Sequence, residues 1–246
     1  MKIYDVVIVG AGFTGLSAAY TLAKSGKKVC LVESDDRLGG LASTFDFTDN
    51  CTVEKFYHHW FNSDNYVQEL ISELDLEDRI MTLPTRTGMF YNGQIWRLSS
   101  PLDLLKFDAI SFLDRVRLGL VTLWVKRIKN WKKIEHLSIR EWLEPLCGKK
   151  TYSVVWEPLI RAKFSNFSES VSAVWMWKKL VLRGGTRNKS GKEELLYFEG
   201  GFGNLAKEIM KSIKLLEGEL KLNFKVTNIE THNGDLSAVV SEDDKI

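Results

Sequence analysis

The chain has 246 residues, which allows one large domain or two small ones. Its composition, 44% hydrophobic and 27% charged, is that of an ordinary globular protein and excludes disordered and collagen-like chains. With 34 Lys and Arg against 32 Asp and Glu, the net charge of +2 is too small for a chain whose main partner is nucleic acid.

The first part of the chain predicts a β-α-β unit. Residues 2–9 are β-branched and almost continuously apolar toward their end, which indicates a strand covered on both faces of a parallel sheet. Residues 14–25 show helical spacing, and Gly26 stands where a left-handed residue commonly ends a helix. Residues 27–33 predict a second buried strand. The inward face of the helix is expected to carry Leu16, Ala19, Tyr20 and Ala23.

Residues 51–194 predict a second, mainly helical domain that is rich in aromatic residues. Most of the eight tryptophans lie in this range. Helical spacing begins at Asn65, and Ser100 precedes a proline, a common start of a helix. Two further helices are expected after Ser111 and Ser138, because each serine is followed three residues later by an acid that can complete a capping box.

A basic run with interspersed apolar residues extends from Arg115 to Lys133. One interpretation is a helix that lies in a membrane interface, which would be a peripheral contact without a span. The other is a solvated cationic face over an apolar face that packs in the core, and we favour this one. The apolar residues concerned are Leu120, Leu123, Trp124 and Trp131.

The last fifty residues return to alternating helix and strand. Gly200 and Gly201 precede an amphipathic helix, and residues 220–230 then predict a strand. Asn233-Gly234 predicts a type I′ turn before a last short strand. The two ends of the chain would therefore form one discontinuous α/β domain, residues 1–50 and 195–246.

A glycine motif joins the first predicted strand to the first predicted helix. It has the pattern G-x-G-x-x-G, in which the first glycine makes a tight turn and the second lets the backbone approach a pyrophosphate. The third permits close packing of helix on strand, and the phosphates meet N–H groups at the positive end of the helix. Glu33, about twenty residues on, is expected to accept hydrogen bonds from ribose hydroxyls. The loop and the first turn of the helix contain Gly10, Gly12, Phe13, Thr14 and Gly15.

A second glycine-containing segment, ESDDRLGGLAST, spans residues 33–44, from the end of the second predicted strand onward. It closely resembles the segment after the second strand in the superfamily of flavin amine oxidases, protoporphyrinogen oxidases and phytoene desaturases. The resemblance implies a Rossmann-like FAD-binding domain in which the double glycine runs along the pyrophosphate and ribityl chain. The residues implied are Gly39, Gly40, Leu41 and Ala42, with Arg37 nearby. Many amine oxidases carry arginine where Leu41 stands, which argues against a monoamine oxidase proper.

A later stretch, residues 200–229, resembles the third strand of the same FAD domain and the helix before it. The resemblance implies that the backbone of Val226 contacts the adenine.

Two adjacent histidines, His58 and His59, are candidate flavin-side residues. Their segment, residues 53–64, resembles one in UDP-galactopyranose mutases in which a histidine-bearing loop lies beside the flavin ring. There they could position a substrate, bond to the flavin or move a proton near neutral pH. Ordinary, partly buried histidines are an equal alternative. They are a poor metal pair, because neighbours on a regular element point apart, so we expect no metal site.

Arg161 and Lys163 could anchor an anionic substrate in a cavity lined by nearby aromatic residues. We favour the other interpretation of these aromatics, that they form the core of the helical domain. The aromatic residues concerned are Trp156, Phe164, Trp175 and Trp177.

The resemblance implies an FAD-dependent oxidoreductase that passes a hydride from a C–H bond of a small molecule to N5 of the flavin. One alternative is a sugar-nucleotide mutase that uses flavin without net redox change. The likeness covers only the first half of a typical superfamily member, and we find no later glycine–acid motif that holds the ribityl chain. We therefore expect a truncated chain, completed by a missing half or by a partner chain, or else a non-catalytic fragment that binds such a partner.

The cysteines and the N-terminus bear on location. Cys30, Cys51 and Cys147 are odd in number and form no C-x-x-C pair, which argues against a disulfide framework and for a reducing compartment. The chain runs directly into its first strand, which leaves no room for a signal peptide. No stretch reaches the ~18 consecutive apolar residues of a membrane span. We expect a cytoplasmic protein with no transmembrane segment.

Overall fold

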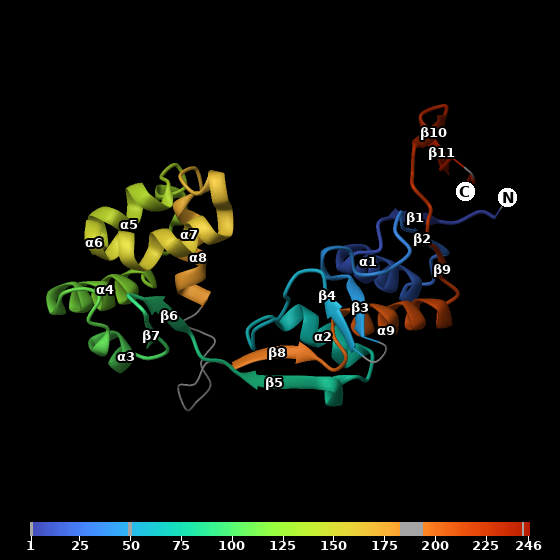
Figure 1. Ribbon diagram of the computed structural model, residues 1–246. Helices are drawn as coiled ribbons and strands as arrows, with labels where there is room; N and C mark the ends of the chain where they lie inside the picture. The colour runs from blue at the N-terminus through green and yellow to red at the C-terminus, as the bar shows by residue number, and fades with distance from the viewer. Residues whose placement is uncertain (1, 49–50, 183–193, 243) are drawn as a thin grey trace. The chain divides into compact units, whose positions relative to one another are not determined.

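The computed structural model describes residues 2–48, 51–182, 194–242 and 244–246 (Figure 1). The chain divides into two compact units, Met1–Leu83 with Leu195–Ile246, and Pro84–Glu194. The first division falls after Leu83 rather than at residue 51, where we predicted it. Residues 51–83 belong with the first unit because β4 (Cys51–Glu54) pairs with β3 (Thr44–Thr48), and α2 (Asn65–Glu73) buries Ile71 in the first core.

A three-stranded parallel sheet organises the first unit. Its order is β1 (Val6–Val9), β2 (Val29–Val32), β9 (Glu219–Lys221), and each neighbouring pair is parallel. All four residues of β2 are buried, whereas those of β1 are partly buried or exposed. We predicted that the first strand is covered on both faces. Both faces do make core contacts, since Ile8 packs against one buried cluster and Val7 against another, but the coverage is only partial. β1 also lies at an edge of the sheet, where no strand of the described residues pairs with its outer side.

Two helices pack together in the core of this unit, α1 (Phe13–Lys24) and α9 (Phe202–Leu215), as Figure 1 shows. The buried residues of α1 are those that the sequence predicted, Leu16, Ala19, Tyr20 and Ala23. Gly26 follows the helix with a left-handed φ of 83°. The predicted β-α-β unit is therefore confirmed.

The predicted strand at residues 220–230 is two strands in the structure. β9 ends at Lys221, and β10 (Asn228–His232) pairs instead with β11 (Asp235–Val240). The chain turns at Asn223, whose φ is 54°, so that Phe224 is buried against the end of β2. The type I′ turn is confirmed, because Asn233 and Gly234 both have positive φ, 54° and 91°.

Short strands occupy part of the stretch that we predicted as mainly helical. β5 (Ile80–Pro84) pairs with β8 (Glu194–Phe198), and β6 (Gly88–Tyr91) pairs with β7 (Gln94–Arg97) across an Asn-Gly turn. Three-residue helical turns connect several elements of the two units. They are η1 (Gly40–Ala42), η2 (Glu77–Arg79), η3 (Trp131–Lys133) and η5 (Ser165–Phe167).

The other regular elements described in the second unit are helices. Its helices are α3 (Pro101–Lys106), α4 (Phe112–Val125), α5 (Ile139–Cys147), α6 (Lys149–Thr151), the π-helical turn η4 (Tyr152–Trp156), α7 (Glu157–Phe164) and α8 (Ala173–Leu182). Ser138 and Glu141 form the predicted capping box of α5. Ser111 caps α4, but the Asp114 carboxylate accepts from the Ser111 hydroxyl instead of the backbone, so only half of that box forms.

Most of the tryptophans of this unit pack in its core. Trp142 is buried, and Trp156, Trp175 and Trp177 lie against the buried cluster, which confirms the core interpretation for these aromatic residues. The apolar residues that we named in the basic run, Arg115 to Lys133, do not all pack in the core as we expected. We favoured a cationic face over an apolar core face, and this was wrong, because Leu120, Leu123 and Trp124 of α4 are exposed. The core of the unit instead receives Leu118 and Val125 from this helix.

Candidate functional site

The candidate site lies where the parallel strands of the first unit end. The N–H of Gly10, after β1, donates to the carbonyl of Val32 at 2.7 Å. The N–H of Glu33, after β2, donates to the carbonyl of Lys221 at 2.9 Å. The carboxyl ends of neighbouring parallel strands therefore bring the glycine loop and the acidic residue to one edge, where open α/β sheets bind ligands.

The glycines of the two motifs lie against one another. A Cβ on Gly15 would stand 1.9 Å from the carbonyl oxygen of Gly10, so only glycine fits there. The N–H of Gly39 donates to the carbonyl of Ala11 at 2.9 Å, and a Cβ on Gly40 would stand 3.2 Å from the Cα of Gly12. Gly39 and Gly40 both have positive φ, 107° and 57°, which favours glycine. We call these two loops together the glycine cradle: residues 10–15 and 39–40.

The first turn of α1 opens at the cradle. Gly12 is the N-cap residue, no side chain caps the helix, and no acidic residue lies in the first turn. The N–H groups of the first turn of a helix have no partner inside the helix. The positive end of the helix dipole, at the turn that contains Phe13 and Thr14, is thus not neutralised by a side chain of this helix.

The Glu33 carboxylate stabilises the glycine cradle through a hydrogen bond to its backbone. One carboxylate oxygen accepts from the N–H of Ala11 at 2.7 Å, and the other accepts from the N–H of Asp35 at 2.9 Å and the hydroxyl of Ser34 at 3.0 Å. Burial raises the pKa of the Glu33 carboxyl, but the hydrogen bonds from the backbone outweigh it and leave the pKa below its usual value. The side chain is therefore an ionised acceptor at neutral pH, at the end of the strand where a ribose acceptor is expected.

Arg37 holds the double glycine in place. Its guanidinium forms an ion pair with Asp46 at 2.7 Å and donates to the carbonyl of Thr44 at 3.2 Å. Both partners are on β3, so this contact ties the loop to the next strand. In the turn that follows, Leu41 is 78% exposed, whereas Ala42 is buried and its N–H donates to the carbonyl of Gly39.

Val226 lies outside any strand, in the connection between β9 and β10. It is partly buried and packs against the cluster that contains Cys30 and Val32. Two residues before Val226, the N–H of Phe224 donates to the Glu33 carbonyl at 2.8 Å, which holds this connection near Glu33. The segment is thus at the same edge as the cradle, although the strand expected there is interrupted.

The two histidines point their rings at different neighbours. His58 is partly buried, and its ring lies 5.5 Å from that of Phe202. His59 is exposed and lies between Tyr57, at 6.3 Å, and Phe61, at 5.2 Å. Nδ1 of His58 is 2.6 Å from the carbonyl of Phe56. A carbonyl oxygen can only accept, so Nδ1 carries a proton, and Nε2 is the acceptor of the neutral ring. No group of three metal-ligating side chains occurs among the described residues.

Phe202, at the start of α9, contacts both the glycine cradle and the histidine-bearing loop. The sequence analysis did not single it out. Its ring lies 5.8 Å from Phe13 of the cradle, 5.5 Å from His58 and 5.5 Å from Trp60. The side chain is 8% exposed. Phe202 therefore fixes the histidine loop relative to the glycine cradle. An aromatic residue directly after Gly200-Gly201 was the only signal in the sequence.

The start of α9 is also held by a partly buried acid, Glu54, that the sequence did not indicate. One oxygen of Glu54 accepts from the N–H of Phe202 at 2.9 Å and from the hydroxyl of Tyr197 at 2.5 Å. Burial and this carboxylate raise the pKa of Tyr197 above its usual range, so the hydroxyl stays protonated. A Cβ on Gly201 would stand 2.9 Å from the same Glu54 oxygen, which explains the glycine at this position.

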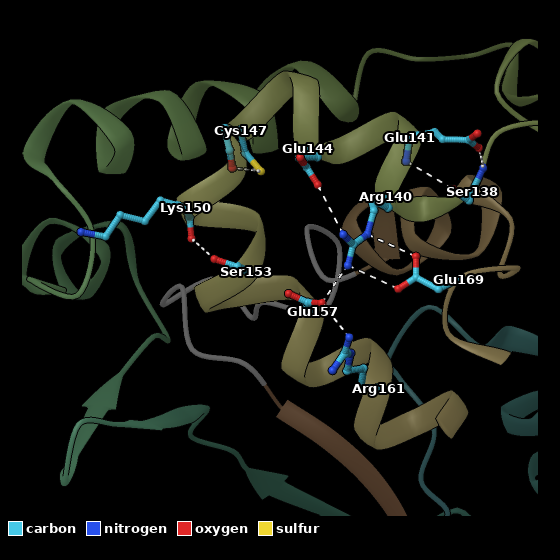
Figure 2. Close-up of polar contacts among 11 residues, drawn as sticks. Ser138, Arg140, Glu141, Glu144, Cys147, Lys150, Ser153, Glu157, Arg161 and Glu169 are labelled. Carbon is cyan, nitrogen blue, oxygen red and sulfur yellow. Dashed lines mark hydrogen bonds and ion pairs between the residues drawn. The ribbon is translucent and has the colours of Figure 1, made fainter. Parts of the chain in front are cut away.

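The two predicted substrate residues, Arg161 and Lys163, are on the exposed side of α7 in the second unit. Arg161 forms an ion pair with Glu157 at 3.2 Å. Figure 2 shows that Glu157 belongs to a larger group, in which three carboxylates turn toward Arg140. Arg140 pairs with Glu157 at 2.7 Å and with Glu169 at 3.2 Å, and its guanidinium lies 5.2 Å from the Tyr152 ring. It thus joins α5 to α7 and to the chain before α8.

Replacing Arg140 by Gln is expected to destabilise the second unit by about 1–2 kcal/mol, because it leaves carboxylates from three segments facing each other. This figure allows for solvent screening, since the Arg140 side chain is 37% exposed. Urea unfolding would measure the loss. The control is Arg161→Gln, which removes one exposed ion pair and should cost less than about 0.5 kcal/mol. Equal losses in the two variants would contradict the bridging role of Arg140.

The sheet and the glycine cradle define a Rossmann-type α/β protein. The family described as flavin containing amine oxidoreductase matches residues 13–246, so the chain belongs to this family. It is 26% identical over 250 residues to a 15-cis-phytoene desaturase of Glycine max and 25% identical over 249 residues to amine oxidase [flavin-containing] A of Equus caballus. A solved structure from Exiguobacterium sp. 255-15, assigned as a protoporphyrinogen oxidase, superposes with a TM-score of 0.69 at 17% identity.

The chain spans less than half the length of the curated relatives it matches. The two alignments cover 95% and 94% of this chain but 44% of the desaturase and 45% of the amine oxidase. The structural match covers 98% of this chain and 56% of the other. The predicted superfamily and the predicted coverage of a part of it are thus confirmed.

Proposed function

We propose that this chain is the cofactor-binding part of an FAD-dependent oxidoreductase that acts on a small molecule. The observation that carries the proposal is the contact between its two glycine loops, where the backbone of Gly39 bonds to Ala11 and Gly40 lies against Gly12. A surface free of Cβ atoms beside an uncapped helix N-terminus fits a pyrophosphate. Membership in a flavin-containing family supports FAD over other dinucleotides.

Within this proposal, each part of the cradle has a separate task. Gly12 and the first turn of α1 bind the pyrophosphate, and Glu33 accepts a hydrogen bond from a ribose hydroxyl. The backbone of Gly39, Gly40 and Leu41 runs along the ribityl chain of FAD toward the flavin ring. The backbone of Val226 contacts the adenine, and Arg37 keeps the double glycine in position through Asp46. Bound FAD would supply the hydride acceptor, its N5 atom, while the protein supplies binding, orientation and electrostatics.

The first test is the cofactor itself. The purified protein should absorb near 450 nm, roughly where any oxidised flavin absorbs, and the cofactor released on denaturation should have the mass of FAD. Protein that is colourless and that binds no added FAD would overturn the proposal.

Glu33→Gln is expected to weaken FAD binding about tenfold, because a charge-assisted hydrogen bond to the ribose is replaced by a neutral one. Titration of FAD-free protein, followed by quenching of flavin fluorescence, measures the change. The matched control is Glu73→Gln, which removes a carboxylate that pairs with Lys24 on the surface of the same unit. If both variants bind FAD like the original protein, Glu33 does not contact the ribose.

On the substrate side, His58 is the better candidate of the two histidines. Its Nε2 can accept a hydrogen bond or a proton, because Nδ1 is committed to Phe56, and the ring is held against Phe202. Arg161 and Lys163 remain proposed anchors for an anionic substrate. If Arg161 serves in this way, Arg161→Gln should raise KM, although it costs the second unit less than about 0.5 kcal/mol of stability.

A mutase that uses flavin without net redox change is the second candidate function. Its support is the divergence of the two neighbouring rings, which leaves one histidine on Phe202 and turns the other outward. Activity that requires pre-reduced flavin, with affinity for a nucleotide sugar, would select this function. Turnover with oxygen or a quinone would exclude it.

The outer edge of β1 could accept a strand from another stretch of polypeptide. Within the described ranges no strand pairs with this side, and unpaired strand edges readily accept another strand. We propose that a strand from the remainder of the protein or from a partner chain pairs here. A non-catalytic chain that only binds such a partner would show no flavin when isolated, so the absorbance test also decides this alternative.

We further propose a cytoplasmic location, since all three cysteines are free. Burial raises the pKa of the Cys147 thiol to about 11 and also raises that of Cys30, whereas Cys51 is exposed. Cell fractionation would test this location.

A further inference from the structure

The outer face of α4 carries a stripe of large apolar side chains. At 100° per residue these residues fall within a sector about 120° wide, on the side of the helix away from Leu118 and Val125, which are buried. Each of them is between 39% and 78% exposed. We call them the α4 stripe: Phe112, Leu113, Val116, Leu120, Leu123 and Trp124.

Positive charge is concentrated at the C-terminal end of this stripe. Residues 111–133 contain seven Lys and Arg and a single Asp, whereas the rest of the chain has 27 Lys and Arg against 31 Asp and Glu. Lys126, Arg127 and Lys129 are exposed, and none of the ion pairs between described residues involves them. These cations are therefore available to an anionic partner.

The two arginines nearer the start of α4 have a different role. Arg115 donates to the carbonyls of Leu105 and Ile110, and Arg117 donates to those of Pro145 and Leu146. Both side chains thus bind backbone of their own unit. This contrast restricts the free positive charge to the segment that follows the stripe.

We propose that the α4 stripe and the basic segment after it, residues 126–133, bind the surface of an anionic lipid bilayer. The apolar stripe would enter the boundary between headgroups and acyl chains, and the long Lys and Arg side chains would extend to the phosphates. Tryptophan, which suits such interfaces, lies in both parts, as Trp124 and Trp131. No helix of the described residues is long and apolar enough to cross a membrane.

Charge complementarity favours this occupant over another stretch of protein. Protein interfaces are depleted of lysine at their centres, because a buried ammonium group needs a counter-charge. A polypeptide that covered the stripe would have to offer several carboxylates to residues 126–133. Anionic headgroups provide negative charge over the whole contact without specific pairing.

The test is sedimentation of the purified protein with lipid vesicles. Vesicles of phosphatidylcholine and phosphatidylglycerol in about equal parts should bind at least tenfold more tightly than phosphatidylcholine alone, and added salt should weaken the binding. The double variant Leu120→Gln, Leu123→Gln should lose about tenfold or more in vesicle affinity. Lys126→Gln with Arg127→Gln should reduce the preference for anionic vesicles.

The control removes exposed apolar side chains elsewhere in the same unit. Leu159 and Phe167 are 46% and 73% exposed, and the variant Leu159→Gln, Phe167→Gln should bind vesicles like the original protein. Circular dichroism checks that each variant is folded. The proposal fails if neither kind of vesicle binds, or if the Leu120, Leu123 variant binds unchanged. It also fails if this variant abolishes a self-association seen without lipid, because a second copy would then cover the stripe.

Discussion

Replacing Gly15 by Ala is expected to weaken FAD binding at least ~100-fold, about 2.7 kcal/mol. The added Cβ would stand 1.9 Å from the carbonyl oxygen of Gly10 and 3.4 Å from a methyl group of Ile8. The Gly10 carbonyl must therefore move by more than ~1 Å to reach ordinary contact distance, since carbon and oxygen atoms rarely approach within ~3 Å. That movement displaces the loop that Glu33 and the double glycine hold.

Gly26→Ala is the matched control for this variant. Gly26 lies in the same β-α-β unit, between α1 and β2, and has a φ of 83°, but a Cβ there would meet no atom within 4 Å. The substitution should cost about 1 kcal/mol of stability through backbone strain and leave FAD affinity within about twofold. Fluorescence titration with FAD, on samples shown to be folded by circular dichroism, compares the two. Original affinity in the Gly15 variant would show that FAD does not use this loop.

A variant at a third glycine, Gly12, distinguishes a defect in FAD binding from a defect in folding. Gly12 has an ordinary φ of −71°, and a Cβ there would stand 3.9 Å from its nearest neighbour, the Cα of Gly40. Gly12→Ala should therefore fold with unchanged stability. It should still reduce FAD affinity, because the Cβ would occupy the surface that the pyrophosphate approaches. If this stable variant binds FAD with unchanged affinity, the pyrophosphate does not bind in the glycine cradle. This conclusion would hold even if Gly15→Ala failed to fold.

Elements defined by short-range signals were predictable from the sequence. The glycine loop, the inward face of α1, the Asn233-Gly234 turn and the cap at Ser138 each depend on residues within one or two turns of chain. Periodicity could not decide which side of α4 is buried, because the helix has apolar residues on two opposite faces. The break at residues 222–227 depends on Phe224 and the end of β2, which are far apart in sequence.

The candidate site shows the same difference between local and distant contacts. The sequence indicated the cradle and Glu33 because their spacing along the chain is fixed by the β-α-β unit. It did not indicate Glu54, Tyr197 or Phe202, since the contacts of β4 and β8 with α9 form only in the folded chain. It also left open which histidine turns inward, which the ring of Phe202 decides.

Replacing Phe202 by Ala should destabilise the first unit by about 3–4 kcal/mol, the usual cost of removing a buried Phe side chain. The ring touches Phe13, His58 and Trp60, so its loss leaves a cavity between the cradle and the histidine loop. Phe202→Leu keeps most of the volume and should cost about 1–2 kcal/mol. Urea unfolding measures both losses.

The leucine variant carries the functional part of this prediction. In folded Phe202→Leu, FAD affinity should fall about tenfold, because Phe13 loses the ring that holds the first turn of α1 in place. The control is Phe198→Leu, in the same core and fully buried, whose ring lies against Arg79 and not against the cradle or the histidines. The two variants should lose similar stability, but only Phe202→Leu should lose FAD affinity. If both bind FAD equally well, Phe202 supports the core alone and does not position the site.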